Sequence, residues 1–176
     1  MKELLVYTDG SCRNNGKKNS SGGMGIHFPN KELEDFSRPY LKGTATNQNT
    51  ELLAILLAIK YIEKHLPLDE YAIIIYTDSK YSIDCVTKWV NGWKKNGWLT
   101  KCGTPVKNKK YIERIHRYIS QNSIELRHVP AHTRGSDKGS VANDAADVLA
   151  KRGGRRAVRA YDLDKNADNI EILLIE

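Results

Sequence analysis

Two aspartates follow apolar segments of closely similar sequence. Leu4–Thr8 reads Leu-Leu-Val-Tyr-Thr before Asp9, and Ile73–Thr77 reads Ile-Ile-Ile-Tyr-Thr before Asp78. If these segments are neighbouring parallel strands, the aspartates emerge ~4.8 Å apart at one sheet edge, where open α/β sheets form their sites. Carboxylates that close repel unless a cation lies between them, and oxygen ligands favour magnesium or manganese. The alternative is that each aspartate caps the following helix or turn.

Two further acids lie on predicted helices. Glu51 falls in the first turn of an apolar helix, where a glutamate also complements the helix dipole. Asp147 lies in the segment "NDAADVLA", and Asp144 lies one turn earlier on roughly the same face. Each of these acids taken alone is explained as a surface residue. Their spacing in the sequence does not show whether they meet Asp9 and Asp78.

His132 is the candidate proton shuttle. It lies in a glycine-containing loop after "HVPA", and an imidazole titrates near neutral pH. The alternative is an ordinary solvent-exposed loop histidine. His128, at the end of the preceding strand, is interpreted as structural.

The elements that must position these residues form one mixed α/β domain. The first three predicted strands form an antiparallel meander, and the fourth, apolar on both faces, is expected to be parallel to its neighbour. Loops are expected over 10–23 and 130–140, and Gly153-Gly154 is expected to end the last helix. The final apolar run, 170–175, is either an extra strand or a loosely docked tail. The predicted strands are 4–8, 24–28, 33–41, 71–77 and 124–129, and the predicted helices are 51–65, 79–87, 88–98, 107–120 and 141–152.

Positive charge is concentrated in one segment. The net charge is +7, yet residues 88–117 carry nine cations and one acid, which leaves the rest of the chain at −1. The same segment holds Trp89, Trp93 and Trp98. Tryptophans among lysines suit the sugars and bases along a phosphate backbone, so the segment indicates nucleic-acid binding. The alternative is a solvated helix face.

Composition excludes several other classes of protein. A chain of 176 residues with 40% hydrophobic residues can bury its own core. It has no apolar run of the ~18 residues that a membrane span requires, and its start resembles a strand rather than a signal peptide. Its three cysteines have no metal-binding spacing. They are expected as free thiols in an intracellular, reducing compartment such as the cytoplasm.

Seven segments together resemble the type 1 ribonuclease H family. They are "YTDGS", "TNQNTELLAIL", "YTDSKY", "WVNGWKKNGW", "PVKN", "HVPAH" and "NDAADVLAKRG", in the family order from Tyr7 to Gly153. The resemblance implies a ribonuclease H-like fold: a mixed five-stranded sheet, with three antiparallel strands and then parallel ones, flanked by helices.

The resemblance also implies a site of four carboxylates. Asp9, Glu51, Asp78 and Asp147 would hold two Mg²⁺ ions together with substrate, with Mn²⁺ as a possible substitute and Asp9 bridging the ions. Asp144 would take an accessory acid position, and His132 would move protons. The segment between His132 and Asn143 is longer than in close relatives, and the insertion lies around residues 134–140.

Substrate contacts are implied in the same way. Asn47 and Gln48 match residues that reach the minor groove, although residues there also cap helices; Asn14 and Asn15 are weaker candidates. Thr46 and Asn108 match a phosphate pocket, which here lacks an arginine because Thr44 stands at that position. The predicted contacts also include channel aromatics, nearby lysines and a helix residue: Tyr81, Trp89, Trp93, Lys94, Lys95 and Asn143. Trp98 is equally consistent with the core.

The expected function is a metal-dependent endoribonuclease that cuts the RNA strand of RNA–DNA hybrids and leaves 5′-phosphate and 3′-hydroxyl ends. Residues 1–154 would form the catalytic domain, and residues 155–176 a tail of unknown role. The chain is expected to be a monomer with no membrane partner. The alternatives are a non-catalytic hybrid-binding module and a DNA-directed nuclease of the same fold.

Overall fold

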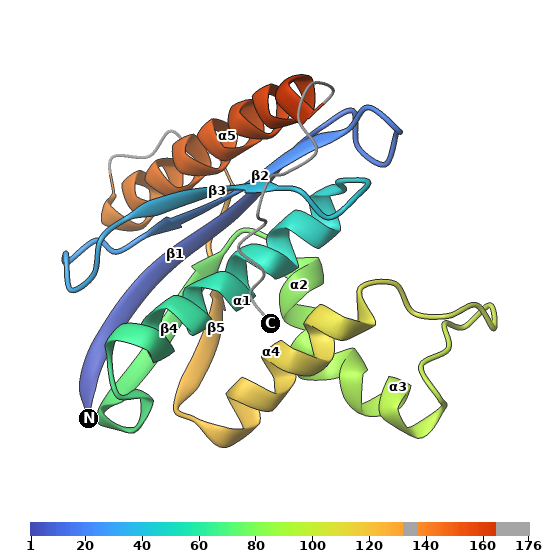
Figure 1. Cartoon of the computed structure of the whole chain (residues 1–176). Coiled ribbons are helices and arrows are strands. Elements are labelled where there is room, and N and C mark those ends of the chain that lie inside the picture. The colour runs from blue at the N-terminus through green and yellow to red at the C-terminus, as the bar shows by residue number, and fades with distance from the viewer. Residues whose placement is uncertain (132–136, 165–176) are drawn as a thin grey trace.

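The computed structural model describes residues 1–131 and 137–164, with side chains of the last helix described as far as Arg159. A five-stranded mixed sheet forms the centre, and helices cover both of its faces (Figure 1). This is the fold class predicted from the sequence. The strands are β1 (Lys2–Arg13), β2 (Ser21–His27), β3 (Phe36–Tyr40), β4 (Tyr71–Thr77) and β5 (Ile124–His128). The helices are α1 (Asn47–His65), α2 (Lys80–Asp84), α3 (Val90–Lys95), α4 (Lys109–Gln121) and α5 (Lys138–Asp164), with a 3₁₀ turn at Leu68–Glu70 and a π-helical turn at Cys85–Trp89.

The strand order places the first and fourth strands side by side. The order across the sheet is β3-β2-β1-β4-β5. β1 pairs antiparallel with β2 and β2 with β3, while β1 pairs parallel with β4 and β4 with β5. The parallel β1–β4 register ends at Tyr7 opposite Tyr76. Asp9 and Asp78 each follow two residues later, which confirms the predicted parallel neighbours.

The first hairpin is longer than predicted. β1 continues past Asp9 to Arg13, and β2 begins at Ser21, so the loop expected over 10–23 spans only the residues between them. Backbone pairing with β2 sustains the extension, from Tyr7 opposite His27 to Arg13 opposite Ser21. The sequence did not predict this pairing, because residues 10–23 are mostly small and polar and lack the alternating apolar pattern of a strand.

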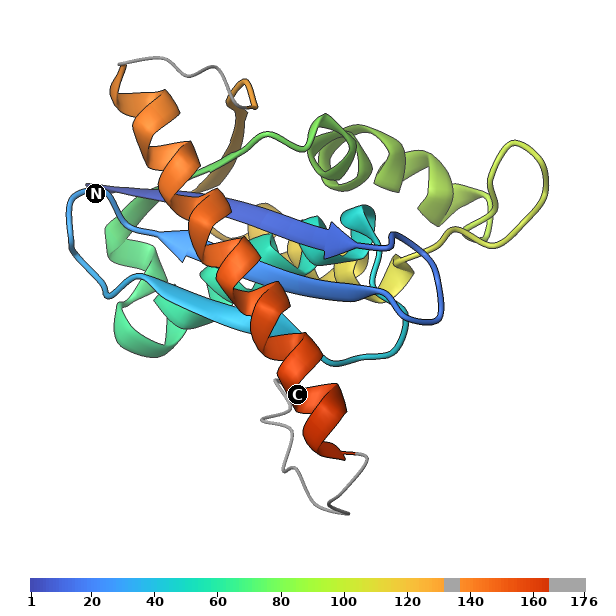
Figure 2. The same cartoon turned by 90° about the horizontal axis from the view of Figure 1, so that it is seen from above.

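The last helix was predicted to end too early. α5 runs through Gly153 and Gly154 to Asp164, so residues 155–164, expected in a tail, continue the helix. The two glycines serve close packing instead of helix termination. A Cβ on Gly153 would lie 2.3 Å from the Arg38 carbonyl oxygen, and one on Gly23 would lie 2.1 Å from the Gly154 nitrogen. α5 therefore crosses the sheet with its backbone against that of β2 and β3 (Figure 2). The run 170–175 lies outside the described residues.

The main core lies on the opposite face of the sheet. α1 packs on β1 and against α4, and its residues 49–59 are all buried. Thr46 caps α1 with a capping box: its side chain accepts from the Asn49 nitrogen at 3.0 Å, and Asn49 Oδ1 accepts from the Thr46 nitrogen at 2.9 Å. The cap fixes where α1 begins and so the position of Glu51 one turn later.

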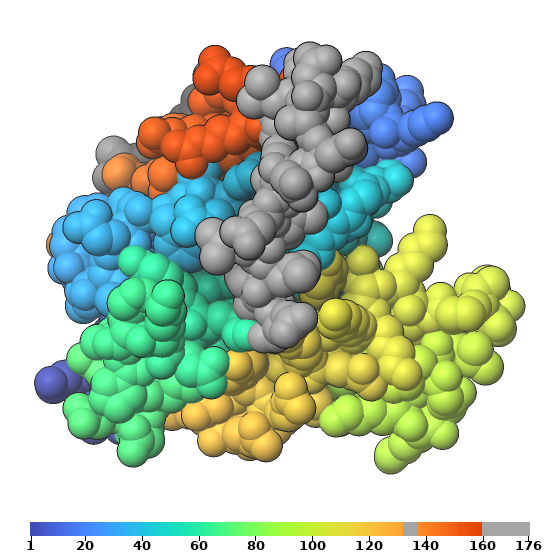
Figure 3. Space-filling view, viewed as in Figure 1, coloured from blue at the N-terminus to red at the C-terminus, as the bar shows by residue number. Residues whose placement is uncertain are grey.

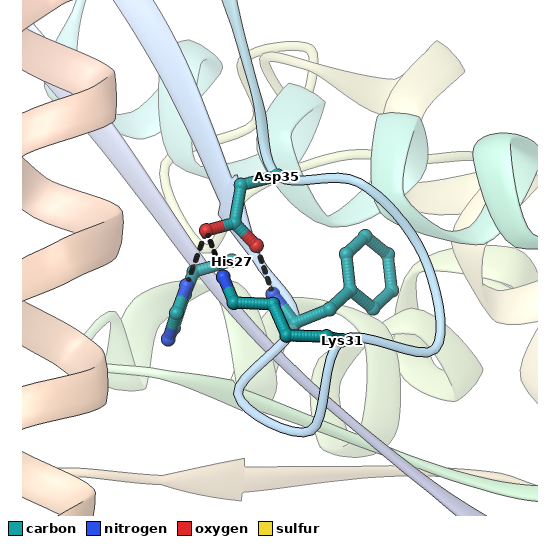
Figure 4. Close-up of polar contacts among 4 residues, drawn as sticks. His27, Lys31 and Asp35 are labelled. Carbon is teal, nitrogen blue, oxygen red and sulfur yellow. Dashed lines mark hydrogen bonds and ion pairs between the residues drawn. The ribbon is translucent and has the colours of Figure 1, made fainter.

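The connection between β2 and β3 is closed by one carboxylate. Asp35 accepts a hydrogen bond from the Phe28 nitrogen at 2.9 Å and contacts Lys31 Nζ and His27 Nδ1, each at 2.8 Å (Figure 4). Burial would raise the pKa of Asp35, but these partners together lower it. The cluster stabilises a turn in which Lys31 has a φ of 62°.

Candidate active site

Four acidic residues from separate parts of the chain line one cleft of about 470 Å³. Asp9 comes from β1, Glu51 from α1, Asp78 from the residue after β4, and Asp147 from α5. Both faces of the sheet contribute, since α1 and α5 lie on opposite sides of it (Figures 1 and 2). The other lining residues are Gly10, Ser11, Cys12, Asn47, Gln48, Ser79, Tyr81 and Lys151.

Three of these carboxylates form a tight group. Oxygens of Asp9, Glu51 and Asp78 all lie within 4.8 Å of one another. Asp9 and Glu51 are 6% and 8% exposed, so bulk water screens them little. The geometry matches the strand-end argument for the two aspartates, and α1 adds a third acid.

Gly10 makes the meeting of Asp9 and Glu51 possible. A Cβ on Gly10 would lie 2.3 Å from the Glu51 nitrogen and 2.4 Å from the Thr50 carbonyl carbon. Only glycine permits backbone to approach that closely. The Gly10 amide also lowers the pKa values of both the Asp9 and the Glu51 carboxyl groups, against the larger effect of burial. β1 and α1 are therefore in backbone contact beside the acidic group.

The crowding changes the proton affinity of the group. Burial, followed by the charges of Asp78 and Asp147, raises the pKa of Asp9 to about 7, although Lys151 and the Gly10 amide oppose this. Burial and the charges of Asp9 and Asp78 raise the pKa of Glu51 well above its ordinary value. The folded chain thus holds several carboxylates of like charge close together, which destabilises their ionised forms.

Asp147 faces the same cleft with a partner of its own. Lys151 Nζ lies 2.6 Å from Asp147 Oδ2, one helical turn along α5. The Asp147 side chain is 16% exposed and that of Lys151 is 54% exposed. Nearby, Ser11 Oγ donates to the Ala150 carbonyl oxygen at 2.8 Å and holds α5 against β1.

The donor set fits a hard divalent cation. Glu51 Oε2 is buried, and no described residue donates a hydrogen bond to it. A buried carboxylate oxygen without a partner is costly unless something charged completes its contacts. Three convergent carboxylates with no nitrogen or sulfur donor among them are the ligands that Mg²⁺ or Mn²⁺ prefers.

The predicted groove-reading residues lie at the cleft. Asn47 and Gln48 begin α1, are exposed, and line the cleft beside Glu51. Asn15 Oδ1 accepts from the Asn47 nitrogen at 2.8 Å, so the first hairpin holds the start of this helix. The cap itself is made by Thr46, which leaves the Asn47 and Gln48 side chains at the cleft surface.

The predicted aromatic residues form a continuous row. Ring centroids are 6.0 Å apart for Tyr81–Trp89, 5.7 Å for Trp89–Trp93 and 6.1 Å for Trp93–Trp98. The exposed fraction of the side chain falls from one tryptophan to the next: Trp89 is 43% exposed, Trp93 is half-buried and Trp98 is only 8% exposed. Trp98 is thus a core residue, with Lys109 Nζ 5.2 Å from its ring centroid. The row starts at Tyr81, which lines the cleft.

The remaining predicted residues are distributed around this row and α5. Lys94 and Lys95 are exposed at the end of α3. Asn108 lies at a φ of 60° before α4, and its side chain acts on the Tyr81 hydroxyl, whose pKa it lowers against the larger effect of burial. Asn143 is 1% exposed, and no described residue bonds its Oδ1 atom. His132 lies outside the described residues, as do residues 134–136 of the insertion around residues 134–140.

Sequence reasoning missed Lys151 as a cleft residue. The signal was present, because Lys151 lies four positions after Asp147 and such pairs face each other on a helix. Cys12 and Ser11 were missed for another reason. Both follow Asp9 in a segment expected to be loop, and only the extended β1 places them at the cleft.

Comparison with known proteins gives one consistent family. A family model described as RNase H matches residues 1–155. The chain is 45% identical over 145 residues to a probable ribonuclease H of Acanthamoeba polyphaga mimivirus, covering 82% of this chain and 63% of that protein. It is 37% identical over 155 residues to human ribonuclease H1, covering 88% of this chain and 51% of that protein. The chain therefore spans between half and two thirds of the length of these relatives.

A solved structure agrees with the sequence matches. The solution structure of the PFV RNase H domain superposes with a TM-score of 0.68 at 27% identity. The superposition covers 87% of this chain and 94% of that domain.

Proposed function

Because this chain belongs to the type 1 ribonuclease H family, we propose that it is an endoribonuclease that hydrolyses the RNA strand of RNA–DNA hybrids. The observation that carries the proposal is the group of three carboxylates within 4.8 Å, with Asp147 in the same cleft. Water would add to the phosphorus while the bond to the 3′-oxygen breaks, which leaves a 5′-phosphate and a 3′-hydroxyl.

Divalent metal would be held by the four acids. We propose Mg²⁺, with Mn²⁺ as a substitute, bound by Asp9, Glu51, Asp78 and Asp147. When bound, such ions lower the pKa of an attacking water and stabilise the charge on the leaving oxygen. The chain's own contribution is rigid positioning: Gly10 sets the distance between Asp9 and Glu51, and Ser11 holds α5 and so Asp147. His132 is proposed as the residue that moves protons.

Substrate would lie across the cleft and the row of aromatic side chains. Asn47 and Gln48 offer amide groups at the cleft surface for the RNA strand, where a 2′-hydroxyl distinguishes RNA from DNA. Tyr81, Trp89 and Trp93 would contact the DNA strand, with Lys94 and Lys95 on its phosphates. Thr46 and Asn108 are proposed phosphate contacts and Asn143 a supporting one. Backbone contacts of this kind carry little sequence information.

The competing proposal, a hybrid-binding module without catalysis, does not account for the acidic group. Burial and neighbouring carboxylates raise the pKa values of Asp9 and Glu51, which means that their ionised forms are destabilised in the fold. A protein that only binds hybrid would gain nothing from such carboxylates, since their charge also repels phosphates. A DNA-directed nuclease of the same fold would share the acids but not the segment of tryptophans and lysines.

One assay separates these possibilities. End-labelled RNA–DNA hybrid, RNA duplex and DNA duplex are each incubated with Mg²⁺ or with chelator. Cleavage of the hybrid alone, only with metal, supports the proposal, whereas binding without cleavage supports the module. Cleavage of DNA duplex would favour the DNA-directed alternative.

The remaining proposals concern the setting of the protein. Cys12, Cys85 and Cys102 are free thiols, and we propose a monomer in a reducing intracellular compartment such as the cytoplasm. Within the part of the chain that the structure describes, no helix combines the length and apolarity needed to cross a membrane. Residues 1–154 are proposed as the catalytic domain, with α5 continuing beyond that boundary.

A further inference from the structure

The outer side of α5 carries a run of cations, of which only Lys151 belongs to the cleft of the proposed site. Residues 151–159 contain five basic residues and no acid. All five are exposed, while Gly153, Gly154 and Ala157 on the other side of the helix are buried against the sheet. We name this surface the outer basic face of α5; it consists of Lys151, Arg152, Arg155, Arg156 and Arg159.

The outer basic face begins inside the acidic cleft. Lys151 lines the cleft and pairs with Asp147, and Arg155 follows one turn further along α5. In Figure 2, α5 lies outermost on its side of the sheet, and no other described element covers it. Figure 3 shows the side chains of this helix at the molecular surface. A strand that leaves the cleft along α5 therefore meets one cation after another.

The arginines are arranged in a way that an isolated helix disfavours. Arg152 and Arg156, like Arg155 and Arg159, are like charges four positions apart, which repel on a helix surface. Among the described side chains, no acid forms an ion pair with any of these four arginines. An external polyanion would relieve this repulsion. Arginine also suits the task, because its planar guanidinium binds phosphate oxygens in a bidentate manner.

We propose that the outer basic face of α5 is a second binding surface for the sugar-phosphate backbone of the hybrid, beyond the cleft. The proposal rests on the proposed function. From residue 151 to residue 159 the helix rises about 12 Å, which corresponds to the rise of roughly three to four nucleotides at about 3.4 Å each. The face would thus contact two or three phosphates. It extends past residue 155, where the match to the family model ends.

The test compares a short hybrid, which covers only the cleft and the row of aromatic residues, with a long one that continues along α5. Binding is measured without cleavage in the Asp9→Asn background. Arg155, Arg156 and Arg159 are changed to Gln, because these three lie furthest from the cleft. The matched control changes Lys2, Lys60 and Lys64 to Gln, which removes the same charge from β1 and α1 and leaves α5 unchanged.

The arginine variant is expected to bind the long hybrid about tenfold more weakly, with the slope of log K against log [salt] reduced by about two. The short hybrid should bind with unchanged affinity, and the lysine control should resemble the unmodified chain. Equal losses for both lengths, or an equal loss in the lysine control, would overturn the proposal. Cleavage of the short hybrid by the unmodified chain tests the proposed function separately, since it does not involve these arginines.

Discussion

A Cβ atom placed on Gly10 would lie 2.3 Å from the backbone nitrogen of Glu51, so β1 and α1 touch through their backbones beside the acidic group. A methyl group there must push α1 away from β1. Gly10→Ala is therefore expected to lower the free energy of unfolding by about 1–3 kcal/mol, the usual cost of overpacking. It should also weaken Mg²⁺ binding and reduce hybrid cleavage, because Glu51 moves away from Asp9. Chemical denaturation, a metal titration and a cleavage assay measure the three effects.

Gly92→Ala is the matched control for that change. Gly92 lies in α3 with nothing within 4 Å of its missing Cβ, so the substitution should stabilise the helix by about 0.5–1 kcal/mol and leave cleavage unchanged. Equal behaviour of the two variants would show that the contact between Gly10 and Glu51 carries no strain.

The pair of aspartates shows what the sequence could reveal. Repeated apolar runs ending in Asp9 and Asp78 predicted parallel neighbouring strands, because a strand buried on both faces of a sheet has a continuous apolar sequence. Glu51 and Asp147 were harder to place. Spacing locates each on a helix, but only the packing of α1 and α5 on opposite faces of the sheet brings them to one cleft.

The largest error in the sequence-based prediction was the end of the last helix, which was placed at Gly153 and Gly154. Gly153 and Gly154 match the usual signal for a helix end, and the sequence contains no mark that distinguishes this role from close packing. The difference depends on Gly23 and Gly25, which are more than 120 positions earlier. Contacts between segments so far apart are set by the fold and leave no local pattern.

The acidic group should oppose folding when no metal is bound. The folded state raises the pKa of Asp9 from 3.8 to about 7, so it holds a proton that the unfolded chain releases. The contribution of Asp9 to stability is consequently present at low pH and lost as pH rises through about 7. Asp9→Asn should raise the stability of the metal-free protein at pH 8 by about 1–3 kcal/mol, while abolishing cleavage and preserving hybrid affinity.

Asp144→Asn serves as the control for that substitution. Asp144 lies on α5 near Asp147 but does not line the cleft, so its change should leave stability at pH 8 nearly unaltered. Thermal unfolding in chelator at pH 5 and pH 8 makes the comparison. A metal-free Asp9→Asn protein less stable than the unmodified chain at pH 8 would contradict the account of the crowded carboxylates.

Metal should reverse this pH dependence. Mg²⁺ binds the ionised carboxylates and competes with protons, so it should raise the Tm more at pH 8 than at pH 5. The same increment should vanish at both pH values in Asp9→Asn. Melting curves with and without millimolar Mg²⁺ provide the measurement, and a larger increment at pH 5 would rule out these carboxylates as the metal ligands.

Lys151 is expected to compete with metal for Asp147. Its ammonium lies 2.6 Å from the Asp147 carboxylate, and its charge repels cations entering the cleft. Lys151→Gln should therefore tighten Mg²⁺ or Mn²⁺ binding about three- to tenfold, in line with the loss of one exposed ion pair. Calorimetric titration in the absence of nucleic acid measures this directly. Lys88→Gln is the control, because Lys88 makes the same 2.6 Å pair with Asp84, which does not line the cleft, and it should leave metal affinity unchanged.

The packing of α5 on the sheet gives a prediction whose sign differs between the two interpretations of Gly153. As a helix end or an exposed helical position, Gly153→Ala would be neutral or would stabilise the chain by up to about 1 kcal/mol through helix propensity. In the structure the added methyl group meets the Arg38 carbonyl oxygen at 2.3 Å and the Gly23 α-carbon at 3.1 Å. Both are backbone atoms that cannot rotate away, so α5 must lift from β2 and β3.

For Gly153→Ala we expect a loss of about 1–3 kcal/mol in the free energy of unfolding. We also expect weaker metal binding, because Asp147 lies on the same rigid helix less than two turns earlier. Stabilisation by Gly153→Ala in urea denaturation would mean that α5 does not rest on the sheet at this point.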